Sequence, residues 1–392
     1  MRPRTLALVL AGGAGSRLGP LTEHRAKPAV PFGGTHRLVD VALSCCSHAG
    51  VADVWVSEQH NPASLADHLA NGRPWDLDRT RGGLLVLHPA KGTEREGWHE
   101  GTADGLWRLA PLIRQLDPDV LLLASADAVY RMDYDDIVAG HLDGGSTVTF
   151  VTADVPPGDD PARFGVVQAS GGRVTGYAYK PDEPDGDLIA TEVFAFTPGP
   201  LLDCLEELAS SAGDDGLEDI GVAALPAFVE AGEAREHRHA GYWRDVGTIP
   251  SYWRGHQELL GDAPAFRLDD EALPLLTRPE RSGPARLRRS AEVDDSLLAP
   301  GSDVAGTVER SVLAAGVIVE AGAVVRDSVL LPGVVIRCGA VVERAILDEG
   351  VVVAEGVTVG GSGGDDEIAV VGAGEQVTSD LGAGRQQPAD KS

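Results

Sequence analysis

The stretch LALVLAGGAGSRLGPLTEHRAKPAVPFGG, residues 6–34, decides the fold of the N-terminal half of the chain. Its first five residues are all apolar, which is typical of a strand buried on both faces of a parallel sheet. A glycine-rich turn with Gly12, Gly13 and Gly15 follows directly. Glycines at such a place let backbone N–H groups surround an anion, as they do at a helix N-terminus. The stretch therefore predicts a phosphate-binding turn at the end of a strand.

Two common phosphate-binding motifs do not fit this turn. The dinucleotide fingerprint needs a third glycine where Leu18 stands, and no Gly-Lys-Ser/Thr sequence follows to form a P-loop. Two cationic residues, Arg17 and Lys27, follow the turn instead. Either they face bound phosphates, or the segment is a plain strand-to-helix turn whose charges are solvated.

Outward from this stretch, strand-like and helix-like segments alternate as far as residue 249. Apolar, β-branched runs at 51–59, 119–127 and 146–155 predict strands, and residues 103–116 have apolar side chains at helical spacing. This alternation predicts an α/β domain with a doubly wound, mostly parallel, Rossmann-like sheet. Ligands of such sheets bind beyond the carboxyl ends of the strands, where the glycine turn and Asp127 are both placed.

The C-terminal part of the chain has a different period. Residues 311–327, 328–344 and 345–361 align without gaps, and each segment carries two glycines six residues apart. β-Branched residues, glycine corners and a short fixed period are typical of hexapeptide coils in a left-handed β-helix. A stack of β-hairpins is the alternative. The predicted boundaries are 1–249 for the α/β domain, 250–295 for a linker, 296–361 for the β-helix and 362–392 for a partly disordered tail.

Composition and charge exclude several classes of function. The chain has 392 residues and a net charge of −27, which argues against nucleic acid as a partner, since such an interface needs about 6–10 phosphate-neutralising cations. A small phosphorylated substrate stays possible, because a few buried cations can set the local field. Four cysteines show neither zinc spacing nor a disulfide framework, so we expect a cytoplasmic protein. No segment approaches the ~18 apolar residues of a membrane span, so no membrane partner is expected.

Two aspartates are candidate metal ligands. Asp127 ends a buried strand, where a carboxylate is costly unless it binds a cation or a hydrogen-bond donor. Asp245 lies in the aromatic, glycine-flanked turn GYWRDVGT. Two carboxylates beside a phosphate-holding turn suit Mg²⁺, which completes its coordination shell with water and phosphate oxygens. The alternative is that each aspartate caps a helix or a turn.

Motifs spread along the chain resemble the glucose-1-phosphate adenylyltransferase (ADP-glucose pyrophosphorylase) family. They are the opening stretch, EGTADGL at 100–106, FGVV at 164–167, Lys180-Pro181 and GYWRDVGT at 241–248. The resemblance covers nearly the whole chain, β-helix included. It implies transfer of a nucleotide from an NTP to a sugar 1-phosphate with release of pyrophosphate, and Mg²⁺ as the cofactor.

The resemblance also implies a role for each matched residue. For nucleotide binding it implies Leu10, Gly12, Gly13, Gly15, Gln59, Gly101 and Thr102. For binding of the sugar phosphate it implies Lys180, Tyr179, Gly165, Asp219 and Trp243. For catalysis it implies Arg17 and Lys27, which would neutralise the departing pyrophosphate, and Asp127, which would hold Mg²⁺ together with Asp245.

The residues that would read the sugar hydroxyls depart from the family pattern. Tyr179 stands in place of a glutamate, Ala190 in place of a serine and Glu192 in place of a glycine. On the nucleotide side Lys91 stands in place of a glutamine, so ATP and GTP both stay open as donors. The metal- and phosphate-binding residues are kept, which favours a working enzyme with an altered acceptor.

Three functions follow from this pattern. The favoured one is a nucleotidylyltransferase whose acceptor is a glucose-like cyclitol phosphate, such as the valienol 1-phosphate of aminocyclitol antibiotic pathways. The alternatives are a glucose-1-phosphate adenylyltransferase of glycogen synthesis and a catalytically silent regulatory subunit. Because a single stack of coils leaves apolar surface uncovered, we also expect a homo-oligomer, either a dimer or a tetramer.

Overall fold

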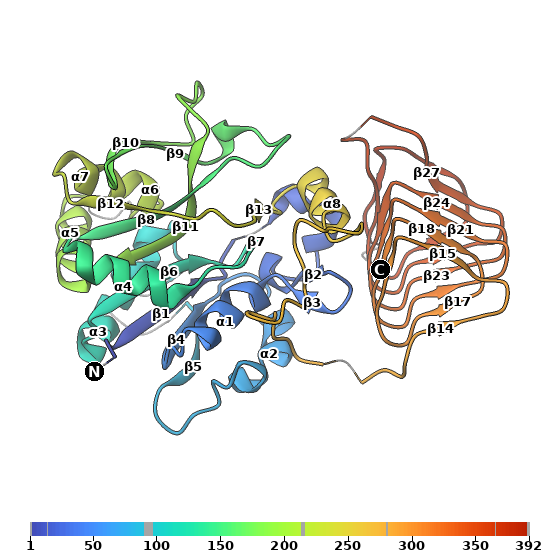
Figure 1. Cartoon of the computed structure of the whole chain (residues 1–392), viewed down its shortest axis with the longest axis horizontal. Helices are drawn as coiled ribbons and strands as arrows, with labels where there is room; N and C mark the ends of the chain where they lie inside the picture. The colour runs from blue at the N-terminus through green and yellow to red at the C-terminus, as the bar shows by residue number, and fades with distance from the viewer. Residues whose placement is uncertain are drawn as a thin grey trace.

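The computed structural model describes residues 2–13, 15–89, 97–212, 216–279, 281–364 and 366–389. Within these residues the chain forms an α/β domain and a β-helix that lie side by side, with α8 between them (Figure 1). The predicted fold class is confirmed. No helix of the described part is long and apolar enough to cross a membrane.

The centre of the α/β domain is a nine-stranded sheet, counted over the described residues. Its order is β5 (Gly83–Leu87), β4 (Asp53–Ser57), β1 (Thr5–Leu10), β6 (Val120–Ser125), β11 (Leu188–Phe196), β8 (Val148–Asp154), β12 (Ala234–Arg238), β10 (Arg173–Tyr179) and β9 (Gly165–Ser170). The first four strands are parallel, and only β11 and β10 run opposite to the others in this sheet. The carboxyl ends of β1, β4 and β6 therefore meet at one edge.

Both faces of this sheet are buried, as the all-apolar sequence of β1 predicts. Ala7 and Val9 pack into one hydrophobic cluster, and Leu6 and Leu8 pack into another. The first cluster includes α1 (Val39–His48), α2 (Ala63–Leu69), α4 (Tyr134–Gly144) and α8 (Ile249–Gln257). The second includes α3 (Thr102–Leu116), α5 (Pro198–Ala212), α6 (Ile220–Ala223) and α7 (Leu225–Glu230). Alternate side chains of one strand thus hold the two helical layers.

Short elements connect these layers. Four 3₁₀ segments occur in the described part: η1 (Ser16–Thr22), η2 (Lys27–Ala29), η3 (Ala70–Trp75) and η4 (Pro161–Arg163). Two small antiparallel pairs are formed by β2 (Pro31–Phe32) with β3 (His36–Arg37), and by β7 (Ala128–Tyr130) with β13 (Trp243–Asp245). The second pair lies next to the carboxyl end of β6, and it positions part of the site.

The C-terminal part is built from three parallel sheets of six strands each in the described residues, the arrangement of a left-handed hexapeptide β-helix. One sheet holds β14 (Arg286–Leu287), β17 (Asp303–Val304), β20 (Ile318–Val319), β23 (Val335–Ile336), β26 (Val352–Val353) and β29 (Gln376–Val377). The second holds β15 (Glu292–Asp294), β18 (Thr307–Glu309), β21 (Val324–Arg326), β24 (Val341–Glu343), β27 (Thr358–Gly360) and β30 (Leu381–Gly382). The third holds β16 (Leu297–Leu298), β19 (Val312–Leu313), β22 (Val329–Leu330), β25 (Ala345–Leu347), β28 (Ala369–Val371) and β31 (Gln386–Gln387).

The boundaries predicted for this part are wrong at both ends. The first coil begins at Arg286 rather than at 296, and the last described strand ends at Gln387 rather than before 362. The terminal coils carry Arg, Glu and Gln where inner coils carry Val and Ile, because each terminal coil packs against a single neighbour. An insertion between β27 and β28 also interrupts the period. The tail predicted to be partly disordered therefore contains the last coil, apart from residues 390–392, which lie outside the described part.

The two domains share packed side chains. Leu331, Ile346 and Val370 of the β-helix belong to the same hydrophobic cluster as α1 and α8. An ion pair also crosses the interface, since Arg25 Nη1 lies 2.7 Å from Asp348 Oδ1 and both side chains are buried. Much of the expected linker is therefore part of a fixed interface, and the β-helix supports the segment that follows the glycine turn.

Candidate active site

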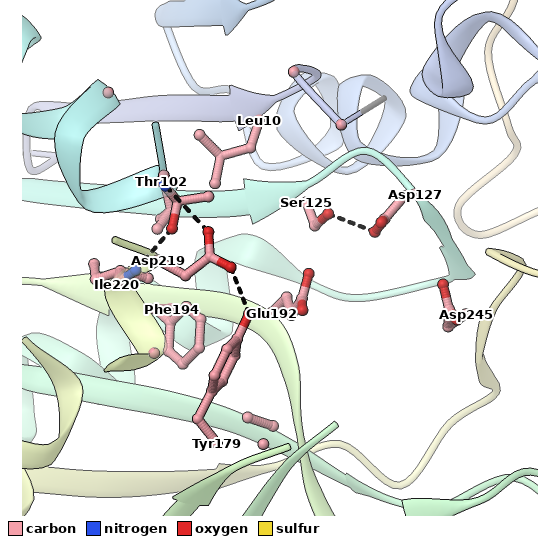
Figure 2. Close-up of a pocket in the computed structure, with 18 of the residues that line it drawn as sticks. Leu10, Thr102, Ser125, Asp127, Tyr179, Glu192, Phe194, Asp219, Ile220 and Asp245 are labelled. Atoms are coloured by element: carbon pink, nitrogen blue, oxygen red, sulfur yellow. Dashed lines mark hydrogen bonds between the residues drawn. The ribbon is translucent and has the colours of Figure 1, made fainter. Parts of the chain in front are cut away.

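A cavity of about 410 Å³ opens at the carboxyl ends of β1, β4 and β6. The glycine turn lies on one side of it, and residues from β10, β11 and the start of α6 lie on the other (Figure 2). Every residue predicted for nucleotide binding, sugar-phosphate binding or catalysis lines this cavity except Gly15. Sequence positions that are more than 200 residues apart are therefore brought to one place, as the parallel sheet requires.

Two carboxylates converge on one ammonium group in this cavity. Lys27 Nζ lies 2.7 Å from Asp127 Oδ2 and 3.5 Å from Asp245 Oδ1. The convergence follows from the pairing of β7 with β13, in which Asp245 is opposite Ala128, the residue after Asp127. The two predicted aspartates thus come together; neither caps a helix, but Asp245 does cap a turn, since its Oδ1 accepts the Gly247 amide.

Each carboxylate is held by further donors. The Ser125 hydroxyl donates to Asp127 Oδ1 at 2.5 Å. The Gly247 amide donates to Asp245 Oδ1 at 3.0 Å, and Arg163 forms an ion pair with Asp245 Oδ2. These contacts fix the orientation of both side chains before any ligand arrives.

The electrostatics of this cluster keep Asp127 and Lys27 charged. Burial alone would raise the pKa of Asp127, but the Lys27 ammonium and the hydrogen bonds from Lys27 and Ser125 hold that pKa below its ordinary value. Burial would likewise lower the pKa of Lys27, and the two carboxylates raise it instead. Asp127 and Lys27 are therefore both ionised at neutral pH.

The carboxylate pair fits a divalent cation. The ammonium of Lys27 shows that oxygens of Asp127 and Asp245 point at one centre of positive charge. Two carboxylates with room for phosphate oxygens are the ligand set that Mg²⁺ prefers. In the described residues no group of three His, Cys, Asp or Glu side chains could hold a metal alone. Any metal here would need oxygens from water or from the substrate.

Two side chains, Thr22 and Lys27, pack so close to Gly15 that the glycine turn has no room for a larger residue there. A Cβ atom on Gly15, whose φ is 67°, would lie 2.9 Å from Thr22 Cγ2 and 3.0 Å from Lys27 Cβ. A side chain at this position would push Lys27 away from the carboxylates. Gly13 is exposed at the mouth of the cavity, and Arg17 is also exposed and lines it. Gly13 and Arg17 therefore place a stretch of backbone and a cation at the mouth of the cavity.

The residues predicted to face the base and ribose are held by backbone contacts. The Gln59 side chain both donates to and accepts from the backbone of His99, at 3.2 and 3.0 Å. At the start of α3, a Cβ atom on Gly101 would lie 2.2 Å from the carbonyl carbon of Glu218. Thr102 Oγ1 accepts the Ile220 amide at 2.8 Å. Through Gly101 and Thr102, the part of the cavity that is predicted to bind the nucleotide is in contact with the start of α6. Lys91 lies outside the described residues.

A chain of hydrogen bonds lines the part of the cavity that is predicted to bind the sugar phosphate. The Tyr179 hydroxyl donates to Asp219 Oδ2 at 2.8 Å (Figure 2). It also accepts from Lys180 Nζ at 2.7 Å. Asp219 Oδ1 accepts the Thr102 amide at 3.2 Å. Burial and the charge of Asp219 raise the pKa of Tyr179, so its hydroxyl keeps the proton. Both polar functions of the tyrosine are thus satisfied inside the protein.

Gly165 and Trp243 contribute shape to this side rather than charge. A Cβ atom on Gly165 would lie 2.6 Å from the Tyr177 ring, so a side chain here would displace that tyrosine. The Trp243 ring meets the Phe164 ring edge to face, with 5.4 Å between centroids. Each contact limits the width of the cavity.

Some side chains that line the cavity were not identified from the sequence. Arg163 pairs with Asp245, and its only signal in the sequence is its place directly before FGVV. Ser125 is two residues before Asp127 and reads as part of the strand. In the sequence, Glu192 stands out only because the family pattern has a glycine at this position, yet its side chain lines the cavity. Burial and the charge of Asp127 raise the pKa of Glu192 to about 7.

The comparison with known families agrees with this geometry. Residues 6–261 match the Nucleotidyl transferase family, and the chain belongs to that family. Residues 281–374 match the GlmU-like, C-terminal hexapeptide family. The protein is a sugar-phosphate nucleotidyltransferase. Members of this class act on a nucleoside triphosphate and a sugar phosphate, and typically use a divalent metal.

One further carboxylate near the site gives a prediction about stability. Glu58 follows β4, and its side chain is fully buried, with His88 Nδ1 at 3.1 Å from Oε1 as its nearest partner in the described residues. Burial raises the pKa of Glu58 from 4.5 to about 7. The folded protein therefore keeps a proton that the unfolded chain loses, and the contribution of Glu58 to stability is lost as pH rises from 4.5 through about 7.

We expect Glu58→Gln to remove this pH dependence. Between pH 4.5 and about 8, the free energy of unfolding of the unmodified protein should fall by about 2–3 kcal/mol relative to the variant. Urea unfolding over this range measures the difference. Parallel curves for the two proteins would show that folding does not raise the pKa of Glu58.

Proposed function

We propose that this sugar-phosphate nucleotidyltransferase joins ATP or GTP to a cyclitol 1-phosphate, such as valienol 1-phosphate, and releases pyrophosphate. The observation that carries the proposal is the state of Tyr179. Its hydroxyl is engaged by Asp219 and by Lys180, whose ammonium also lies 4.4 Å from the centroid of the ring, so Tyr179 offers an acceptor its flat ring rather than a free hydroxyl. An unsaturated carbocycle suits this surface, because it lacks a ring oxygen and is partly planar.

The side chains that line the cavity suit the binding and alignment that this reaction needs. Lys180 lines the cavity without a carboxylate partner among the described residues, which suits it to hold the phosphate of the acceptor. Arg17 lies at the glycine turn, where the departing pyrophosphate would be. Asp127 and Asp245 would hold Mg²⁺, whose chemistry is to neutralise the charge on the reacting phosphates. Lys27 orients both carboxylates.

No covalent intermediate is required in this proposal. The acceptor phosphate attacks the α-phosphorus of the triphosphate, a new phosphorus–oxygen bond forms, and the bond to the leaving pyrophosphate breaks. Such a displacement needs in-line alignment and neutralisation of charge rather than a nucleophile from the protein. The arrangement of cations on both sides of the carboxylate pair supports this view.

The test is pyrophosphate release with a panel of acceptors, each with ATP and with GTP. We expect kcat/KM for the cyclitol 1-phosphate to exceed that for glucose 1-phosphate at least about tenfold, a difference of about 1.4 kcal/mol in transition-state binding. Equal or better use of glucose 1-phosphate would favour synthesis of ADP-glucose. No release with any acceptor would favour a catalytically silent regulatory subunit.

We also propose that the protein is a cytoplasmic homo-oligomer, a dimer or a tetramer, assembled through the β-helix. Leu287 and Ile318 lie on the same sheet of the β-helix and are 58% and 40% exposed. Apolar side chains in that position favour burial against a second copy. Light scattering at micromolar concentration should give a multiple of the 40.9 kDa chain. A single-chain mass would contradict the proposal.

A further inference from the structure

Glu192 has an unusual backbone in the middle of the site. It lies in β11, where the register against β8 shifts between Ala190 and Phe194. Its φ is 60°, in the left-handed region that favours glycine. Bulges of this kind redirect a side chain, and a non-glycine residue with positive φ carries strain that persists only when the surroundings enforce it. The bulge turns the Glu192 side chain into the cavity.

The carboxylate of Glu192 lies among the charged and polar side chains of the site but forms no hydrogen bond or ion pair with them in the described residues. It lies between the Tyr179–Asp219 pair and the Asp127–Asp245 pair (Figure 2). Its charge interacts with Lys180, Lys27 and both metal-side aspartates. Within the described residues, however, its carboxylate forms no hydrogen bond or ion pair. This polar group is therefore available to a ligand.

Two structural explanations of Glu192 fail. It does not stabilise the fold, because it combines a strained backbone with a carboxyl group that is destabilised by Asp127 and that has no hydrogen-bond partner among the described residues. It is also not a third protein ligand of the metal, because no group of three potential ligand side chains close enough to hold an ion occurs in the described residues. What remains is an interaction made only when substrate is bound.

We propose that Glu192 is a specificity-determining residue that accepts a hydrogen bond from a hydroxyl group on the ring of the acceptor. The inference rests on the proposed function. On this side of the cavity, the Tyr179 hydroxyl donates to Asp219 and accepts from Lys180, and Asp219 accepts two hydrogen bonds, whereas the Glu192 carboxylate accepts none in the described residues. Glu192 and Lys180 line the same cavity and their charges interact, so a ring whose phosphate is held by Lys180 would come within reach of the Glu192 carboxylate.

The experiment compares the unmodified protein with Glu192→Gly and Glu192→Gln. The probes are glucose 1-phosphate, the singly deoxygenated analogues of glucose 1-phosphate, and valienol 1-phosphate. Turnover is measured by pyrophosphate release, and binding of the same probes is measured by calorimetry. The matched control is Asp117→Gly, because Asp117 is also an acidic residue with positive φ, at 52°, but is exposed after α3, outside the cavity.

We expect Glu192→Gly to lower kcat/KM for the best acceptor by about 10–100-fold, the loss of one hydrogen bond to a charged group. The KM for the triphosphate should stay unchanged. Removing the contacted hydroxyl from the probe should weaken binding to the unmodified protein but not to the variant. The melting temperature of Glu192→Gly should rise by roughly 2–4 °C, as strain is released. Glu192→Gln should show a smaller loss of kcat/KM, and Asp117→Gly none.

Two results would overturn the inference. One is an equal penalty for every deoxygenated probe in the unmodified protein and in Glu192→Gly. The other is a lower melting temperature for Glu192→Gly with unchanged use of acceptors, which would mean a structural role. If the unmodified protein releases no pyrophosphate with any acceptor, the proposed function fails, and calorimetry with the same probes still decides whether Glu192 binds a ring hydroxyl.

Discussion

Replacing Asp127 by asparagine is expected to lower kcat at least about 10³-fold, because the change removes one of the two carboxylates that converge on the cation position. Asp245→Asn should have a similar effect. The variants should also bind Mg²⁺ more weakly in the absence of substrate, which calorimetry with the metal alone measures. Pyrophosphate release gives kcat.

The matched control is Asp133→Asn. Asp133 caps α4, where its side chain accepts the amides of Asp135 and Asp136, and asparagine caps a helix about as well. This variant should keep normal turnover. Circular dichroism of all variants separates a lost ligand from a lost fold. Near-normal turnover of Asp127→Asn in Mg²⁺ would show that the two aspartates do not hold the metal.

The second large effect is expected at the domain interface. Among the described residues, Asp348→Ala would leave the buried guanidinium of Arg25 paired only with Glu349, whose oxygen is 3.4 Å from Arg25 Nη2 and whose side chain is 39% exposed. Breaking a buried pair in this way costs about 3–5 kcal/mol, since one charge stays buried without its partner. Urea unfolding should therefore show a large loss of stability.

The double variant Arg25→Met with Asp348→Leu tests whether charge is the cause. Apolar residues of similar volume often replace a buried ion pair without loss, so the double variant should be more stable than Asp348→Ala alone. If all three proteins unfold at the same urea concentration, the pair contributes nothing to stability. A loss in Asp348→Ala that the double variant does not recover would instead point to packing.

The sequence allowed most of the fold to be predicted because its patterns are local. The apolar run of β1 and the hexapeptide glycines each specify an element from neighbouring residues alone. The ends of the β-helix could not be found in this way. Polar terminal coils and the insertion before Ala369 break the period, and only their packing on the next coil shows that they belong to it.

The candidate site likewise contains residues that the sequence predicts and residues that it does not. Asp127 and Asp245 stand in recognisable motifs, so they could be named from the sequence as a pair. The contact of Arg163 with Asp245 depends on how η4 is placed against β13, which no local pattern encodes. The position of Glu192 could not be predicted either, because its side chain reaches the cavity through a shift of register between β11 and β8. Long-range pairing decides both positions.

The last coil has a consequence for how the protein is made. A Cβ atom on Gly19 would lie 2.8 Å from Gln386 Oε1, so the segment that follows the glycine turn is in contact with β31. The C-terminal end lies on the side of the β-helix that faces the α/β domain (Figure 1). During synthesis, the ribosome therefore releases the α/β domain long before its packing partners exist. We expect a nascent chain that is stalled before β22 to bind nucleotide poorly and to expose the apolar surface that Leu331, Ile346 and Val370 cover in the finished protein.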